Sequence, residues 1–581
     1  MFKRVSILKT LAKKREQGNS PCYEGVLSGT KALAVFAAIF LGLFCAIPTF
    51  ALDKDKLIRV GISNSNFTKL VYDNAEFTAN GDYEVIDMAS GFSSGIIPSD
   101  CPVKIVLKNA KYSIIKSGQI IASNLDGPLV IRPQKGTLIN IVGLKRGGKT
   151  AYYRGIIELC KSSKNQDLFS IVNVLDLESY LKGVVPNEMP VHFGLEALKA
   201  QTVAARNYAL KPRERFYKEF DVSDSVACQV YFGANTEKEL SNKAIKETNG
   251  IIALSPDEEL ILALYSSTAG GYTENYENAF SDPKTRAFPP QPISYLKARP
   301  DKEGTKKLND EKDAREFYTS TPDTFDNNSP YFRWKREWMA DELEDVLKKT
   351  LIEQSATGFV KPKLTAQNIC DFGNLMNIKV LKRGDSGKIV HLLIDTDKED
   401  FVLSKELVIR RIFKKDGKAL PSGNFVIDLA DTPEGGKFTF QGGGFGHGVG
   451  LSQYGAGKMS SLGYSYGEIL QHYYTGIKLT TNPVTLYSDA NQNSEDQTFY
   501  TTSKKGWVCI DNTGGIKDLI VIINGKEMTI DTLAGLNRKQ RVDVSEYINI
   551  GQNNVVYYIP KLENKRKSMK IYMEIKEAQN D

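Results

Sequence analysis

The segment Gly442–Gly457 constrains the fold more than any other part of the chain, because half of its residues are glycine. Glycine adopts positive φ angles without steric cost, so this segment cannot be a regular helix or strand throughout. Its backbone N–H groups can surround a ligand, and its polar side chains are His447, Ser452, Gln453 and Tyr454. It lacks the Gly-Lys-Ser/Thr ending of a phosphate-binding loop. A structural turn is the alternative, but a turn does not need so many glycines, and we therefore predict a binding segment.

A single carboxylate lies between two prolines at Pro186–Pro190, in the sequence PNEMP. Each proline fixes its own φ and disfavours helix in the preceding residue, so we expect Glu188 on a stiff, extended turn. The following segment, Leu195–Leu210, has the composition and apolar spacing of a helix with one buried stripe. Glu188 is then either a catalytic acid on a rigid support or a charge that complements the start of this helix.

The segment Tyr265–Asn275 reads YSSTAGGYTEN and consists mostly of small and hydroxyl-bearing residues. Because Gly270 and Gly271 carry no side chain, the backbone here can approach a ligand closely. If the segment binds a ligand, Ser267 is its candidate hydroxyl group. A plain surface loop is the alternative.

Charge is concentrated at the N-terminus. The net charge is +7, and residues 1–31 contribute seven Lys or Arg against two acids, so most of the excess lies there. This distribution argues against a broad basic face for nucleic acid. The next segment, Ala32–Ala51, has no charged residue and is long enough to span a bilayer as a helix. We expect a retained membrane anchor, with a signal peptide cleaved after Ala51 as the alternative; either places the bulk of the chain outside the cytoplasm.

The chain is too long for one hydrophobic core, and we expect an α+β fold in several parts. The N-terminal and C-terminal regions consist of short β-branched runs separated by turn residues, which predict strands. The expected divisions are a basic cytoplasmic segment (1–31), a transmembrane or signal segment (32–51), a β-rich region (56–150), a mixed core (151–480) with an inserted loop (281–330), and a C-terminal β-sandwich (485–581).

Several local patterns give further expectations. Tyr152–Ile157 is predicted as a strand and Ser460–Tyr474 as a helix. The segment Tyr331–Trp338 interleaves aromatic and cationic residues, which suits either a half-buried edge strand or stacking on sugar rings, and the strand is favoured. Asn524-Gly525 predicts a hairpin turn in the C-terminal region.

Three segments together resemble the stage II sporulation protein D and amidase enhancer family. The first runs from Glu178-x-Tyr180-Leu181 through VVPNEMP and EALKAQTVAARNYAL, the second is SSTAGGYTEN, and the third is GGGFGHGVGLSQYGA followed by GYSYGEILQHYYTG. The resemblance covers roughly residues 150–480, which makes 151–480 the expected catalytic domain.

The resemblance implies a peptidoglycan lytic transglycosylase that cleaves glycan strands, preferably stripped of stem peptides, to 1,6-anhydro ends. It implies cell-wall remodelling such as sporulation engulfment, at the extracytoplasmic face of the membrane, together with a partner amidase-type hydrolase. The family's catalytic Glu corresponds to Glu188, and we expect burial to keep it protonated. Lys199, Gln201 and Arg206 on the following helix are candidates for holding the sugar. A non-catalytic enhancer of an amidase and a hydrolytic muramidase are the alternatives.

Some members of this family have a Cys and a His-Cys pair that can hold zinc, at the position of DVSDSVACQVY. The matching residues here are Ser223, Ala227 and Cys228, which are too few as Zn²⁺ ligands. A further departure is Tyr272, where a His is common. We therefore predict no zinc and no other cofactor.

Overall fold

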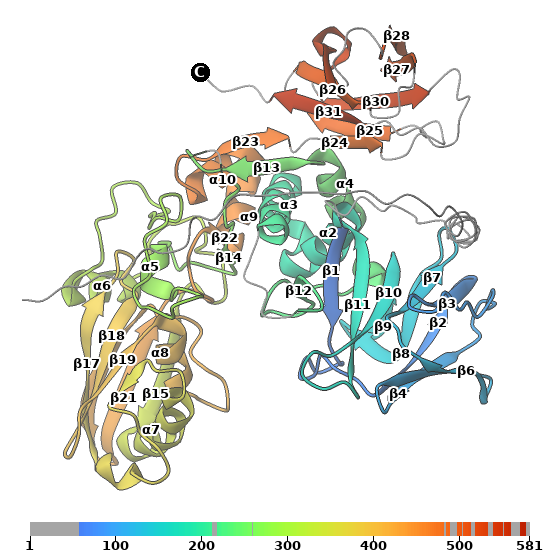
Figure 1. The fold of residues 1–581 in the computed structure, drawn as a ribbon. Coiled ribbons are helices and arrows are strands. Elements are labelled where there is room, and N and C mark those ends of the chain that lie inside the picture. The colour runs from blue at the N-terminus through green and yellow to red at the C-terminus, as the bar shows by residue number, and fades with distance from the viewer. Residues whose placement is uncertain are drawn as a thin grey trace, which may run out of the picture. The chain divides into compact units, whose positions relative to one another are not determined.

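The computed structural model describes residues 57–481, except 212–217 and 258, and parts of the C-terminal region at 484–487, 497–501, 504–512, 517–532, 539–549, 551–558 and 570–576 (Figure 1). The basic segment and the apolar segment Ala32–Ala51 lie outside these residues. Among the residues described, no helix is long and apolar enough to cross a membrane. The fold is mixed α+β, as predicted.

The N-terminal region forms two six-stranded sheets. One sheet has the order β6 (Gln119–Leu125), β5 (Lys111–Lys116), β4 (Val103–Lys108), β2 (Asn74–Ala79), β8 (Ile139–Arg146) and β9 (Lys149–Tyr153). The other has the order β12 (Val222–Ser223), β1 (Leu57–Ile62), β11 (Phe169–Asp176), β10 (Ile156–Lys161), β7 (Leu129–Pro133) and β3 (Tyr83–Asp87). Alternate residues of β4 are buried, as expected for a strand with one solvated face, whereas all residues of β11 except the last are buried.

The predicted strand Tyr152–Ile157 is wrong, because a turn at Arg154-Gly155 separates β9 from β10. Gly155 has a φ of 73°, and a Cβ added there would lie 2.3 Å from the Val174 carbonyl oxygen. The turn therefore needs glycine both for its backbone angle and for its close approach to β11.

The helices lie next to these sheets, and buried side chains of both join one hydrophobic cluster. The helices are α2 (Leu177–Glu188), η1 (Val191–Phe193), α3 (Leu195–Leu210), η2 (Ala234–Thr236), α4 (Glu239–Glu247), α9 (Gln453–Ser461) and α10 (Tyr466–Tyr473). The predicted bounds of α3 are confirmed. It is the central helix and contacts α2, α4, α9 and α10 (Figure 1).

Two short strand pairs accompany these helices: β13 (Ile251–Leu254) with β23 (Lys478–Thr481), and β14 (Tyr265–Ser266) with β22 (Leu451–Ser452). The predicted helix Ser460–Tyr474 is wrong as a single element, since it is divided at Gly463, whose φ is 91°. Ser465 then begins α10 with a capping box to Glu468.

A second hydrophobic cluster lies in the part of the chain between β14 and β22. Its sheets have the orders β15 (Trp334–Met339), β21 (Gly435–Gly442), β20 (Phe425–Thr432) and β16 (Val360–Lys361), β19 (Phe401–Ser404), β18 (Ile389–Thr396), β17 (Leu375–Arg383). Its helices and those of the preceding segment are α5 (Tyr276–Ala279), α6 (Glu311–Thr319), α7 (Ala340–Ser355), η3 (Ile369–Asp371) and α8 (Glu406–Ile412). The favoured edge strand at 331–338 is confirmed by β15, with Trp334 and Trp338 buried.

The described C-terminal strands form two four-stranded sheets that share one core. Their orders are β24 (Val484–Tyr487), β31 (Lys570–Lys576), β26 (Lys505–Asp511), β29 (Lys539–Asp543) and β25 (Gln497–Thr501), β30 (Gly551–Tyr558), β27 (Leu519–Ile523), β28 (Lys526–Ile530), with η4 at Ser545–Tyr547. The predicted turn joins β27 to β28, and Asn524 and Gly525 have φ angles of 52° and 78°. These angles suit a two-residue hairpin connection.

Candidate active site

Glu188 is the last residue of α2 and not part of an extended turn, so the predicted local conformation is wrong. The helix continues through Pro186, and the Asn187 side chain donates to the Gly183 carbonyl oxygen at 2.7 Å. Met189, which precedes the second proline, is extended, with φ −127° and ψ 125°. Of the two prolines, the second therefore ends the helix, because it disfavours the helical conformation in the residue before it.

The carboxylate of Glu188 is half-buried and is held by three neutral donors from three parts of the chain. The backbone N–H of Val230 donates to its Oε1 atom at 2.6 Å. The hydroxyl of Tyr265 on β14 and the side-chain amide of Gln453 at the start of α9 also hydrogen-bond it. Tyr265 comes from the hydroxyl-rich segment and Gln453 from the glycine-rich segment, so both segments singled out in the sequence contact Glu188.

Burial raises the pKa of Glu188 to about 7, and the hydrogen bonds from Val230, Tyr265 and Gln453 oppose this rise. The carboxylate lies at the C-terminal end of α2, where the helix dipole disfavours a negative charge. The dipole of α2 therefore raises the pKa of Glu188, whereas a position at the start of a helix would lower it. At neutral pH the acid and its carboxylate are both populated, which suits a group that gives and takes a proton.

A hydrogen-bonded chain orients Tyr265, a residue that our sequence reasoning did not select. Tyr180 donates to Gln229 Oε1 at 3.1 Å, and Gln229 Nε2 donates to the Tyr265 hydroxyl oxygen at 3.0 Å. Because the Tyr265 oxygen accepts this bond, its own proton is available to Glu188. Burial raises the pKa of Tyr265 well above its usual value, so the hydroxyl remains a donor.

The hydroxyl-rich and glycine-rich segments are joined through their backbones. β14 pairs with β22 in parallel, and beyond it Thr268 forms a bridge with Phe445. A Cβ added to Gly270 would lie 2.8 Å from the Gly443 carbonyl carbon. Several glycines therefore serve the close approach of these two segments, in addition to any role in binding.

The polar side chains predicted in these segments have different surroundings. Gln453 contacts Glu188 and donates to Gln201 Oε1 at 3.2 Å, whereas Gln201 Nε2 is buried without a hydrogen-bond partner. Ser452 is buried and caps α9. The Tyr454 ring packs edge-on against Phe193, with centroids 4.9 Å apart.

Ser267 and His447 flank the same strand pair. The Ser267 carbonyl oxygen accepts a bond from the Tyr454 backbone N–H at 3.0 Å, and its side chain is half-buried. His447 packs against Phe280, with ring centroids 5.1 Å apart, and its Nδ1 atom accepts from the Val449 N–H. Burial lowers the pKa of His447 to about 4, so it is neutral at physiological pH.

Lys199 and Arg206, the predicted sugar-binding cations, have partners within the chain. Lys199 Nζ lies 2.7 Å from Glu196 and 2.8 Å from Glu247. Arg206 is buried and forms a two-pronged ion pair with Glu178, at 2.8 and 2.7 Å. The structure therefore gives both side chains a role in fixing α3, and their contact with a sugar stays a prediction.

The segment where some relatives hold zinc contains a buried ion pair. Asp224, next to Ser223, accepts hydrogen bonds from Arg146 and from the Ser63 hydroxyl. Both partners of the Asp224–Arg146 pair are inaccessible to solvent. The described residues contain no group of three potential metal ligands, and Cys228 is a free, half-buried thiol.

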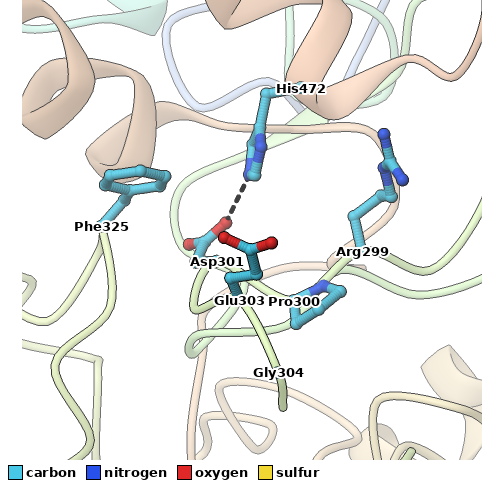
Figure 2. Close-up of a pocket in the computed structure, with 7 residues that line it drawn as sticks. All are labelled: Arg299, Pro300, Asp301, Glu303, Gly304, Phe325 and His472. Atoms are coloured by element: carbon cyan, nitrogen blue, oxygen red, sulfur yellow. Dashed lines mark hydrogen bonds and ion pairs between the residues drawn. The ribbon is translucent and has the colours of Figure 1, made fainter. Parts of the chain in front are cut away.

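A cavity of about 440 Å³ is separate from Glu188, which is not among its lining residues (Figure 2). It is lined by Arg299, Pro300, Asp301, Glu303, Gly304, Phe325 and His472. Inside it, His472 Nε2 lies 3.1 Å from the buried Asp301 carboxylate.

Comparison with known proteins agrees with this arrangement. Residues 165–254 match the family model described as Stage II sporulation protein, and residues 282–450 match a domain of unknown function (DUF8618). Residues 165–254 therefore carry a domain of the stage II sporulation protein family, which is the family that the three segments predicted.

Among its relatives is the amidase enhancer of Bacillus subtilis (strain 168), 30% identical over 319 residues, which are 52% of this chain and 40% of that protein. Stage II sporulation protein D of Bacillus amyloliquefaciens is 28% identical over 326 residues, 53% of this chain and 75% of the relative. An uncharacterized protein of Brachyspira hyodysenteriae is 28% identical over 396 residues, 64% of this chain and 86% of the relative. The chain thus spans less than half of the amidase enhancer.

Proposed function

We propose that this protein is a lytic transglycosylase of peptidoglycan glycan strands, with Glu188 as its acid and base. The observation that carries the proposal is the environment of Glu188: a half-buried carboxyl group whose pKa is raised to about 7 and whose hydrogen-bond partners are neutral. An ordinary glycosidase needs a second carboxylate at about 5–9.5 Å. The groups that shift the pKa of Glu188 include no second carboxylate among the described residues.

One carboxyl group suffices when the sugar supplies its own nucleophile. The protonated Glu188 gives its proton to the glycosidic oxygen, and the bond from that oxygen to C1 of N-acetylmuramic acid breaks. The 6-hydroxyl oxygen of the same sugar then bonds to C1, and its proton passes to the Glu188 carboxylate. Water takes no part, and the acid is regenerated for the next cycle. The donors from Val230, Tyr265 and Gln453 stabilise the carboxylate between the two proton transfers.

The products of glycan strands stripped of stem peptides test this proposal. We expect mass spectrometry of strands incubated with the protein to show 1,6-anhydro ends. Reducing ends at N-acetylmuramic acid would instead indicate a hydrolytic muramidase and would refute the transglycosylase. Strands incubated with heat-inactivated protein provide the blank.

The pH dependence provides a second prediction, for Tyr265→Phe. Removal of a donor that stabilises the carboxylate raises the pKa of Glu188, so the acid form persists to higher pH. We expect the alkaline limb of the pH profile of kcat/KM to move to higher pH by about one unit. Tyr180→Phe, which removes a hydroxyl bonded to Gln229 rather than to the carboxylate, should move it less. A limb that moves to lower pH in Tyr265→Phe would contradict the assigned hydrogen bond.

A second candidate function is enhancement of a peptidoglycan amidase without cleavage of the glycan. It is favoured by the similarity to the amidase enhancer of Bacillus subtilis. Unchanged glycan strands together with faster release of stem peptides by an added amidase would support this function over the first.

We also propose a location and a partner in keeping with either activity. Ala32–Ala51 would tether the protein to the membrane, with residues 56–581 facing the wall, and a peptidoglycan amidase or endopeptidase would be its partner in wall remodelling such as engulfment. Division of the chain into a catalytic domain at 151–480 and a β-sandwich accessory domain at 485–581 belongs to the same proposal.

A further inference from the structure

Two aromatic rings lie exposed beside the glycine-rich segment. Phe445 is 39% exposed and Tyr331 is 37% exposed, and their ring centroids are 4.4 Å apart with a tilt of 36°. Phe445 lies between Gly444 and Gly446, whose φ angles are 92° and 107°. Burial of an aromatic side chain stabilises a fold, so an exposed pair of rings on a backbone that requires two glycines indicates a role in binding.

Backbone hydrogen bonds fix the main chain that carries the two rings. The Gly444 N–H donates to the Tyr331 carbonyl oxygen at 2.9 Å, and Phe445 and Thr268 exchange bonds at 2.9 and 3.3 Å. Arg333, two residues after Tyr331, donates to the Gly270 carbonyl oxygen at 3.0 Å. Both rings are therefore fixed to the segment that begins with Tyr265.

This segment connects the rings to the catalytic acid. Tyr265 hydrogen-bonds Glu188, and Thr268, three residues further, pairs with Phe445. Three residues of extended chain span about 10 Å at most, and the side chains of Tyr265 and Phe445 add to this separation. A glycan strand that is cleaved at Glu188 and continues along this segment would reach the two rings.

We propose that Tyr331 and Phe445 form an aromatic platform on which a pyranose ring of the glycan strand stacks, at a distance along the strand from the bond that is cleaved. The proposal rests on the proposed function and names a further binding site for its substrate. Sugar rings present flat arrays of C–H bonds that pack on aromatic faces, and the polar rim of a sugar stays hydrated there. Both residues lie within 282–450, so the platform assigns a role to the domain of unknown function.

Binding measured without cleavage tests the platform. In the Glu188→Gln background, isothermal titration with denuded glycan strands of defined length compares Tyr331→Ala and Phe445→Ala with the parent. We expect each substitution to weaken binding by about tenfold for strands of three disaccharides, as loss of a partly buried aromatic contact implies. Single disaccharides, which do not reach the platform, should bind all variants equally. Tyr331→Phe and Phe445→Tyr should retain the affinity of the parent.

Tyr464→Ala is the matched control. Tyr464 is also 37% exposed and packs against Phe325 at the separate cavity, with ring centroids 5.9 Å apart. Its removal should leave binding unchanged, and melting temperatures should show that all variants are folded. Parent-like binding by folded Tyr331→Ala and Phe445→Ala, or an equal loss in Tyr464→Ala, would overturn the platform. If the wild-type protein still forms anhydro ends in that case, the platform fails while the proposed function stands.

Discussion

Glu188→Gln is expected to reduce glycan cleavage by at least about 10³-fold, because in the proposed mechanism one side chain performs both proton transfers. The amide can neither protonate the glycosidic oxygen nor accept the proton of the 6-hydroxyl. Glutamine has almost the same shape, so binding of the strand should persist. The measurement is the initial rate of formation of anhydro ends at pH 6, below the pKa of about 7 that burial gives Glu188. Glu188→Asp keeps the acid but draws it back by one methylene, and should retain measurable activity.

The stability of this variant separates lost chemistry from lost structure. The pKa of Glu188 is raised in the folded state, so between about pH 4.3 and 7 the folded protein binds the extra proton. The wild-type protein therefore loses stability as pH rises through this window. Glu188→Gln lacks this ionisation, so its melting temperature should exceed that of the wild-type protein at pH 8. A variant that is less stable at every pH, or one that cleaves strands at the wild-type rate, would contradict the assignment of Glu188.

Glu178→Gln is expected to lower the free energy of unfolding by about 3–5 kcal/mol, since it leaves a buried cation without its counter-charge. The Arg206 side chain is 1% exposed, and apart from Glu178 it donates to the Ile251 carbonyl oxygen at 3.0 Å. Urea denaturation followed by circular dichroism measures the change. If Arg206 were instead free to hold a sugar, as its sequence suggested, Glu178→Gln would change substrate affinity and leave stability nearly intact.

Glu247→Gln is the matched control for this loss, because Lys199 keeps its second partner. Lys199 Nζ remains 2.7 Å from Glu196 when Glu247 is neutral. The expected loss of stability is less than about 1 kcal/mol, as for ion pairs near a surface. If Glu247→Gln lost as much stability as Glu178→Gln, the deeper burial of Arg206 would not explain the loss in Glu178→Gln.

The sequence was informative where local rules decide the structure. The spacing of apolar residues in Leu195–Leu210 defined α3, and Asn524-Gly525 defined a hairpin, because each pattern depends on neighbours within a few residues. The prolines and the following helix made Glu188 a candidate, and the resemblance to the sporulation family selected it as the expected catalytic acid. The same local rules predicted the wrong backbone conformation for Glu188, which lies in α2 and not in an extended turn. The helix accommodates Pro186 close to its end, where few backbone hydrogen bonds remain to be lost.

The sequence did not predict which groups each side chain contacts. Arg206 and Lys199 share one helix, yet Arg206 pairs with Glu178 on the helix before it, and Lys199 pairs with Glu247 at the end of the helix after it. Tyr265 was passed over because nothing near it in sequence shows that its hydroxyl meets Glu188. Tertiary packing decides such contacts. The sequence identifies candidate polar residues, but it does not show whether each one binds a ligand or stabilises the fold.

The pairing of β14 with β22 brings Tyr265 and Leu451 together, although the whole of the second hydrophobic cluster lies between them in the chain. Closing a loop costs entropy that grows only with the logarithm of its length, so even a tenfold longer connection adds about 2 kcal/mol. Such a junction accepts an entire folding unit without displacing the acid that faces it. If the aromatic platform binds the strand as proposed, the module inserted there can be exchanged together with its binding surface, while the strand pair beside Glu188 stays in place.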